Sequence, residues 1–522
     1  MKKLALALSI LLLLPLLSAC ADFIEADTTD RVIESQVQAP QTVVTPESFS
    51  LTFNANDSLN PYEAQDKINL YLSDLLFDSL VTVDNTMTAQ YAIAEKIELS
   101  GTTCVVHVRR DISFSDGSKL SGADVRFSMQ RAMAKSAEFK AKLSNVASVS
   151  LDDNYTLRIT LKTPDLLFAN NLDFPVIKQG TEPAISKVNG KIKNIEPPVG
   201  SGRYVYAVED AIPKLKENTK HREKVKAGIT EIRLYDMPDI DAMRHSVEIG
   251  TVSYIYNDLS DGKLDKINVD LGKVQTTNLV YLGLNSASSV LQEPKLREAV
   301  LLLINKQTVA EQSYAGYAQA ADTPFHPDFA PLKGLSAAKK GVDRDAAVAL
   351  LAEAGYDRTD TDGVRTKEGS RLTLKLAVNK ENDFRSQAAT AISENLKAAG
   401  ISVEIVSVDY KTYLSNINGL QCDMYIGEIN VGNNFDLSPI LKAGGSAAAG
   451  IATAVPETGK AYDAYRAGSG TLQAFLNQFF TDIPFVPLCY RNGMAAYVRG
   501  FEVAPTATVS DIFSNIEQMK IN

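Results

Sequence analysis

The stretch QAATAISENLKAAGISVEIVSVD, residues 387–409, constrains the fold of this chain more than any other. Its first half has the apolar spacing of an amphipathic helix, Gly400 ends that helix, and the alternating run that follows is typical of a strand. A helix that leads directly into a strand belongs to a β–α–β unit, in which the helix covers one face of a sheet. Residues 279–285 and 344–356 continue this alternation as a strand and a helix. The sequence therefore predicts an α/β protein.

Further elements follow from the same patterns. Residues 294–314 predict one long amphipathic helix, and residues 357–379 predict a turn-rich hairpin that leads into a strand. Residues 101–134 predict two strands, a turn and a helix whose first turn Ser121 or Asp124 could cap. A chain of 522 residues is long enough for two to four such domains.

The first twenty residues, MKKLALALSILLLLPLLSAC, predict a secretory signal. The apolar run from Leu4 to Leu17 is shorter than the roughly 20 residues that cross a bilayer, although a plain membrane anchor helix is the alternative. Leu17-Ser18-Ala19-Cys20 resembles the bacterial lipobox, in which the cysteine is acylated and begins the mature chain. We expect residues 1–19 to be a signal peptide, Cys20 to carry lipid, and residues 20–47 to be a polar tether. The folded part would then lie at the outer face of the cell membrane, on the periplasmic side or at the cell surface.

The charge balance argues against a nucleic-acid partner. The chain has 53 lysines and arginines against 63 aspartates and glutamates, a formal net charge of −10. Removal of the signal with its two lysines makes that charge −12. A protein that binds nucleic acid needs a basic face to neutralise phosphates. With 45% hydrophobic and 22% charged residues, the composition is that of an ordinary globular protein.

Cysteine and histidine are too sparse for a metal site. Beyond the lipidated Cys20 the chain has Cys104, Cys422 and Cys489, and we expect these to be buried free thiols because a protein of this size needs no disulfide. If one pair forms, Cys422 and Cys489 are the candidates, since both lie on predicted strands of one region. The sequence has no Cys-x-x-Cys and no zinc-like Cys/His spacing. We therefore expect no metal and no cofactor.

An extracellular hydrolase is the alternative class of function. A Glu/Asp pair could serve glycoside hydrolysis, and Ser336-Ala337-Ala338-Lys339 matches the minimal Ser-x-x-Lys of penicillin-recognising enzymes. The sequence, however, contains no Lys-Thr-Gly or Ser-Asp-Asn partner motif and no Gly-x-Ser-x-Gly elbow. Its four histidines stand alone. We therefore predict that the protein is not an enzyme.

Several separated stretches resemble one family, the extracytoplasmic solute-binding proteins of ABC importers, and within it the peptide/nickel/opine-type (family 5) branch. SLNPY resembles the family's early Leu-Asn-Pro turn, and VHVRRDISFSDGSKLSGADVRFSMQRAM, residues 106–133, is similar to its most characteristic block. PPVGSGRYVY and FVPLCYRNGMAAYVRGFEV, residues 197–206 and 485–503, resemble later segments in the family's order. One departure is that the family commonly carries tryptophan near its cleft. This chain has none, and Gly427-Glu428-Ile429 stands in that neighbourhood.

The resemblance implies a two-lobed, periplasmic-binding-protein-like α/β fold with two crossing hinge segments and an extra α/β domain on the first lobe. Lobe I would contain residues 48–60, 195–275 and 486–522, the extra domain residues 61–194, and lobe II residues 276–485. The lobes would close around a solute like a hinged trap. The closed form, a monomer, would then dock on the permease subunits in the cytoplasmic membrane.

The function implied by the resemblance is that of the substrate-binding component of an ABC transporter. Such a protein captures a peptide-like or other small organic solute between its lobes and delivers it to the permease. Two alternatives stay open. One is a surface lipoprotein of the same fold that acts as a sensor or interaction protein without import, and the other is a protein that binds a nickel chelate.

The stretch CDMYIGEINVGNNFDLSP, residues 422–439, is the predicted ligand-facing edge. DMYI predicts a buried strand, and the carboxylates and amides that follow it lie where open α/β sheets bind ligands. In peptide-binding relatives an acidic group in this stretch meets the ligand's amino terminus, and the resemblance gives that role to Asp436, with Glu428 and Asn430 on the same wall. Alternatively, Asp436 caps a helix that begins at Leu437-Ser438-Pro439. Further candidates for the ligand site are Tyr410, Tyr425, Tyr490 and Arg491.

Overall fold

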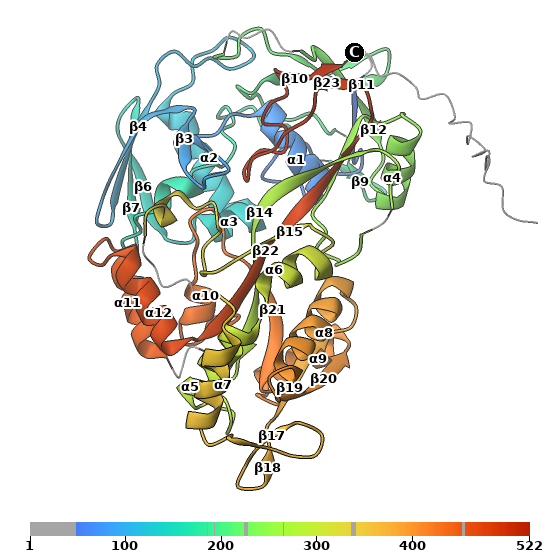
Figure 1. Ribbon diagram of the computed structural model, residues 1–522. Coiled ribbons are helices and arrows are strands. Elements are labelled where there is room, and N and C mark those ends of the chain that lie inside the picture. The colour runs from blue at the N-terminus through green and yellow to red at the C-terminus, as the bar shows by residue number, and fades with distance from the viewer. Residues whose placement is uncertain are drawn as a thin grey trace, which may run out of the picture. The chain divides into compact units, whose positions relative to one another are not determined.

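A mixed sheet forms the centre of the larger α/β region, with strand order β13-β22-β14-β21-β19-β20 and β15 paired to β22. Its two longest strands, β14 (Asp270–Leu284) and β22 (Phe485–Tyr497), are antiparallel and run side by side through the middle of the molecule (Figure 1). The other members are β13 (Tyr254–Asn257), β15 (Ala318–Ala320), β19 (Thr373–Asn379), β20 (Ser402–Val408) and β21 (Met424–Asn430).

The computed structural model describes residues 49–184, 186–192, 194–223, 228–264, 266–335, 341–451 and 455–521. The predicted signal peptide, Cys20 and the tether lie outside these residues, and so does Ser336-Ala337-Ala338-Lys339. The chain divides into residues 1–41 and one compact unit, residues 42–522, to which every element below belongs. Within the described ranges no helix has the length and apolarity needed to cross a membrane.

The β–α–β unit predicted from the sequence is confirmed. Strands β19 and β20 pair in parallel, from Thr373 opposite Ser402 to Asn379 opposite Val408, and α8 (Asp383–Lys397) connects them. Gly400 follows α8 with φ +85°, a left-handed conformation that glycine adopts without strain at a helix end. Gly355 follows α7 (Arg344–Glu353) in the same way, with φ +94°.

The prediction of one helix over residues 294–314 is wrong. Helix α5 spans Pro294–Leu303, and Ile304 is extended with φ −83° and ψ 118°. Asn305 then starts α6 (Lys306–Thr308), because its side-chain oxygen accepts a hydrogen bond from the Thr308 N–H at 3.1 Å. A π-helical turn, Val309–Ser313, follows. The capping asparagine divides a segment whose apolar spacing alone looks continuous.

Two four-stranded sheets come from the first half of the chain. One has the order β1-β12-β11-β10, and the other has the order β4-β5-β7-β6 with α2 beside it. At the start of α2 the Asp124 carboxylate accepts hydrogen bonds from the backbone N–H and hydroxyl of Ser121, at 3.0 and 2.8 Å, which confirms the predicted cap. The bounds are β1 (Ser50–Phe53), β4 (Ala94–Ser100), β5 (Thr103–Val108), α2 (Gly122–Lys135), β6 (Val146–Asp153), β7 (Thr156–Leu161), β10 (Tyr204–Glu209), β11 (Ile212–Glu217) and β12 (Glu231–Asp236).

Short elements complete the described part of the chain. The helices are α1 (Lys67–Leu76), α3 (Ala137–Lys142), α4 (Ile240–Glu248), α9 (Tyr410–Asn418), α10 (Ser438–Leu441), α11 (Pro456–Arg466) and α12 (Leu472–Asp482), with 3₁₀ turns at Phe168–Asn171 and Ala330–Leu332. The short strands are β2 (Val81–Val83), β3 (Ala89–Tyr91), β8 (Lys187–Val188), β9 (Lys191–Ile192), β16 (Arg358–Thr359), β17 (Arg365–Lys367), β18 (Ser370–Arg371), β23 (Phe501–Val503) and β24 (Lys520–Ile521).

Buried apolar side chains form two clusters that meet on the long strands. On β14, Val274 belongs to one cluster and Leu279 to the other. On β22, Ala495 belongs to the cluster of Val274, and Met494 belongs to the cluster of Leu279. The β14–β22 register shifts between Val274 and Asn278, at this same crossing. The two strands therefore connect two packed bodies. The predicted domain boundaries themselves stay a prediction.

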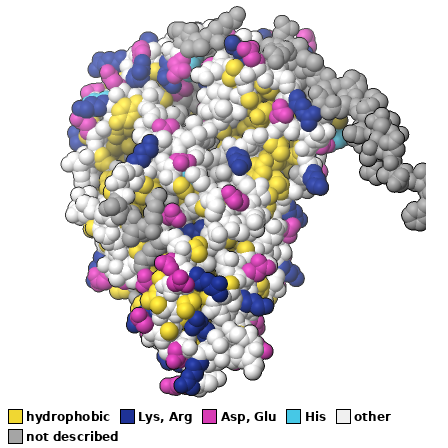
Figure 2. All heavy atoms as spheres, in the orientation of Figure 1, with side chains coloured by type: hydrophobic (Ala, Val, Ile, Leu, Met, Phe, Trp, Pro, Cys, Tyr) yellow, Lys and Arg dark blue, Asp and Glu magenta, His cyan; other side chains and the backbone are white. Residues whose placement is uncertain are grey.

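The cysteines agree with the expectation from the sequence, and the surface carries both signs of charge. Cys104, Cys422 and Cys489 are all buried and free, as predicted, and burial raises the pKa of Cys104 to about 12 and that of Cys422 to about 11. On the face that Figure 2 shows, acidic and basic side chains lie intermixed.

Candidate functional site

A cavity of about 1440 Å³ lies where the two packed bodies meet. That volume exceeds the usual range for small-ligand pockets, about 300–1,000 Å³, so the cavity has room for a solute of several residues, or for a smaller one with water. Charged, amide and aromatic side chains line it, from residues 67–74, 138–145, 162–175, 256–260, 274–278, 428–442 and 462–467, with Arg385, Arg491 and residues 509–512.

Strand β21 brings the predicted polar stretch to this cavity. It runs from Met424 to Asn430, so it is longer than the predicted DMYI strand and already contains Glu428 and Asn430. The extension follows from pairing, because Glu428 lies opposite Val280 and Asn430 opposite Asn278 of β14. Glu428, Ile429 and Asn430 all line the cavity. The end of β21 therefore forms part of the cavity wall.

Glu428 is bound by two arginines that are distant in sequence. Arg491 donates to Glu428 Oε1 from Nε at 2.8 Å and approaches the same oxygen with Nη2 at 2.7 Å. Arg385 Nη2 donates to Oε2 at 2.9 Å. Burial by itself would raise the pKa of Glu428, but the two guanidinium groups outweigh it and hold that pKa below its ordinary value. The Glu428 side chain is therefore a carboxylate fixed between two cations.

Asp436 both borders the cavity and helps to start a helix. It is half-buried, and its Oδ1 accepts a hydrogen bond from the Ser438 N–H at 2.9 Å, at the beginning of α10. The Tyr462 hydroxyl lies 3.4 Å from the same oxygen. Helix α10 has Leu437 as its N-cap and no side-chain cap hydrogen bond, so Asp436 lies one residue before the cap position. The carboxylate therefore supports the turn that leads into α10 without being its N-cap, and contact with a ligand stays a prediction.

The predicted tyrosines lie elsewhere. Tyr425 is 3% exposed; its hydroxyl donates to the Ala449 carbonyl at 3.1 Å, and its ring packs against Tyr281. Tyr490 is fully buried and donates to the Pro324 carbonyl at 2.8 Å. Tyr410 begins α9 and is 49% exposed. Of the predicted ligand residues, the structure therefore brings Glu428, Asn430, Asp436 and Arg491 to the cavity but not Tyr410, Tyr425 or Tyr490.

A second polar cluster, which the sequence reasoning missed, joins the two sides of the cavity. Arg466 Nη2 lies 2.6 Å from Asp165 Oδ1, and Asn434 Nδ2 donates to Asp165 Oδ2 at 3.0 Å. Asn433 Nδ2 donates to Asp173 Oδ2 at 2.7 Å. The consecutive asparagines were the available signal, but their partners lie more than 250 positions earlier in the chain. No sequence pattern connects them.

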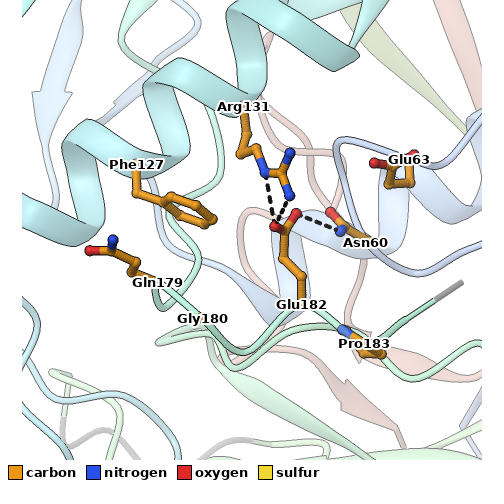
Figure 3. A pocket seen from close by; sticks show the side chains of 8 residues that line it. All are labelled: Asn60, Glu63, Phe127, Arg131, Gln179, Gly180, Glu182 and Pro183. Carbon is orange, nitrogen blue, oxygen red and sulfur yellow. Dashed lines mark hydrogen bonds and ion pairs between the residues drawn. The ribbon is translucent and has the colours of Figure 1, made fainter.

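A smaller cavity of about 460 Å³ lies beside α2 (Figure 3). There Arg131 and Asn60 point at Glu182: Arg131 Nε donates to Oε2 at 2.8 Å, and Asn60 Nδ2 donates to Oε1 at 3.2 Å. The Glu182 carboxylate of this cavity is thus paired within the protein. Among the residues that the structure describes, no group of three or more His, Cys, Asp or Glu side chains is placed to hold a metal ion.

Comparisons with known proteins agree with this geometry. The family model described as bacterial extracellular solute-binding proteins, family 5 Middle, matches residues 88–449, more than half of the chain. The oligopeptide-binding protein AppA of Bacillus subtilis (strain 168) is 25% identical over 377 residues, 69% of this chain and 68% of AppA. The glutathione-binding protein GsiB of Escherichia coli (strain K12) is 25% identical over 371 residues, 69% of each chain.

Solved structures share the fold. A nickel ABC transporter structure from Bacillus halodurans superposes with a TM-score of 0.71 at 21% identity, over 91% of this chain and 99% of that one. NikA from Brucella suis, in complex with Fe(III)-EDTA, gives 0.67 at 18% identity, over 91% and 100%. AppA from Bacillus subtilis, in complex with a nonapeptide, gives 0.56 at 20% identity, over 92% and 100%. The predicted α/β fold class is therefore confirmed.

Proposed function

Because the chain belongs to the bacterial extracellular solute-binding proteins of family 5, we propose that it captures a peptide-like or other small organic solute and delivers it to the permease of an ABC importer. Membership in a solute-binding family also confirms that the protein is not an enzyme. The relatives carry the names oligopeptide-binding and glutathione-binding protein, which supports a peptide-like solute.

The observation that carries this proposal is the cavity of about 1440 Å³ between the two packed bodies. It combines aromatic surface, such as Tyr71 and Tyr256, with polar groups at the end of β21. A few polar groups on an otherwise preformed wall are what a specific solute site needs. Asp436 is the carboxylate that we assign to a positively charged group of the solute, with Asn430 beside it.

Closure of two lobes would enclose the solute. We assign residues 48–60, 195–275 and 486–522 to lobe I, 61–194 to the extra domain and 276–485 to lobe II. The division of the core between Val274 and Leu279 on β14 supports a hinge near the assigned boundary at residue 275. On β22, by contrast, the division falls between Met494 and Ala495, later than the assigned boundary at residue 486. A ligand that binds the closed form more tightly shifts the population toward it, and the closed form would dock on the permease.

The lipid anchor is a separate part of the proposal. Cys20 at the end of the lipobox-like LSAC would be acylated, which would hold the protein beside the membrane permease. Cys20→Ala is the test. We expect the variant to leave the membrane fraction with its solute affinity unchanged, and a variant that stays membrane-bound would contradict lipidation at this residue.

Solute uptake by the host tests the proposed function as a whole. A strain that lacks this protein should lose uptake of the solute that co-purifies with it, and the intact gene should restore that uptake. The sensor alternative would be favoured if the intact strain binds the solute at its surface but the strain without the protein imports it equally well. The solute itself is identified by native mass spectrometry of protein purified from its host.

A further inference from the structure

Two arginines at one wall of a cavity are a strong anion site. Guanidinium groups bind carboxylates and phosphates through several N–H donors at once. Arg385 and Arg491 both line the large cavity, and their side chains are 14% and 3% exposed. In this structure, however, a carboxylate of the chain already binds both of them.

The geometry points to Glu428 as a specificity-determining residue. We infer that its carboxylate fills the two-arginine site from within the chain, so that the solute presents a neutral oxygen acceptor to this wall, such as an amide carbonyl, and not a carboxylate or phosphate. This inference rests on the proposed function, since it needs the solute to lie in the large cavity.

The contacts leave little room for a second anion. Both oxygens of Glu428 are engaged, Oε1 by Arg491 and Oε2 by Arg385, and the Glu428 side chain is only 9% exposed. Arg491 also donates from Nη1 to the backbone carbonyl of Asp258. A solute carboxylate would have to displace Glu428 or lie beside it as a like charge in a partly dehydrated place, and both are unfavourable.

A neutral acceptor has no such conflict. Arg385 binds Glu428 through Nη2, and its side chain stays 14% exposed at the cavity wall, although its Nε is buried without a hydrogen bond to the described residues. The group of two arginines and one glutamate also keeps one positive charge. The negative end of a carbonyl dipole is attracted by that charge without adding a full negative charge next to Glu428.

Inorganic phosphate is the probe that tests this inference. We expect the Glu428→Gln variant, in which both arginines lose their partner, to bind phosphate at least about tenfold more tightly than the wild type. Binding is measured by titration calorimetry and by the rise in melting temperature, with chloride at matched ionic strength as the reference. Glu404→Gln is the matched control, because Glu404 is an exposed residue of β20 and its loss changes the net charge equally.

Equal phosphate affinity in Glu428→Gln and the wild type would overturn the inference. If Glu428→Gln does not fold, Arg385→Gln gives the answer, because it leaves one arginine for one glutamate. The wild type must then bind phosphate no better than Arg385→Gln; about tenfold tighter binding by the wild type would show an open anion site and overturn the inference. Because phosphate is not the transported solute, either result is independent of the uptake experiment that tests the proposed function.

Discussion

The ion pair between Asp165 and Arg466 gives a quantitative test of how the two sides of the cavity are held together. The two side chains are only 5% and 9% exposed, and the charged atoms lie 2.6 Å apart. Replacing Asp165 with asparagine leaves a buried guanidinium group without its counter-ion, which typically costs about 3–5 kcal/mol. Arg466 Nη1 still donates to the Phe435 carbonyl at 3.0 Å, so we expect the lower end, a loss of about 3 kcal/mol in the free energy of unfolding.

Asp152→Asn is the matched control, because Asp152 pairs with Arg158 on β7 and the two side chains are 34% and 47% exposed. An exposed pair contributes about 0–1 kcal/mol, so this variant should stay close to the wild type. Urea unfolding followed by circular dichroism measures both, since the chain has no tryptophan for fluorescence. Equal losses in Asp165→Asn and Asp152→Asn would show that the buried ion pair stabilises the fold no more than an exposed one.

Three further perturbations test other parts of the structure. Asp436→Asn should weaken binding of the co-purifying solute at least about tenfold in calorimetry, while an equal affinity would remove Asp436 from the site. Burial lowers the pKa of His326 to about 4, so the folded state favours the neutral ring. The free energy of unfolding should therefore decrease by up to about 3 kcal/mol as the pH falls from about 6.5 to 4. The His326→Gln variant should not show that decrease. A similar pH dependence in this variant would contradict the assignment. A Cβ on Gly427 would lie 2.4 Å from the Tyr281 ring, so Gly427→Ala should lose about 1–3 kcal/mol in thermal unfolding, and Gly341→Ala, which meets no atom within 4 Å, should not.

Local signals in the sequence predicted the elements that local interactions determine. Ser121 and Asp124 mark the start of α2, and Gly355 and Gly400 mark helix ends, because caps and left-handed residues act within one turn of the chain. A local interaction also explains why the apolar spacing over residues 294–314 was misleading. The interruption depends on one side chain, Asn305, which the periodicity does not register.

The site was predictable only in part, because its partners are far apart in the sequence. The polar stretch after DMYI pointed to Glu428, Asn430 and Asp436, which do line one cavity. Arg385 was missed, since nothing in its own neighbourhood indicates that it meets Glu428 across 43 positions. Pairing with β14 also extends β21 through Glu428 and Asn430. Polar side chains are tolerated there because this end of the strand faces the cavity and not the core.

Solute retention by a variant with a filled cavity shows whether the large cavity is the solute site. Asn430 is exposed and lines the large cavity, so the larger side chain of Asn430→Trp would occupy the proposed solute site. Native mass spectrometry of both proteins purified from their own host is the measurement. We expect a non-covalent solute on the wild type and its loss from Asn430→Trp at unchanged melting temperature. Retention of the same solute by both proteins at equal occupancy would contradict it.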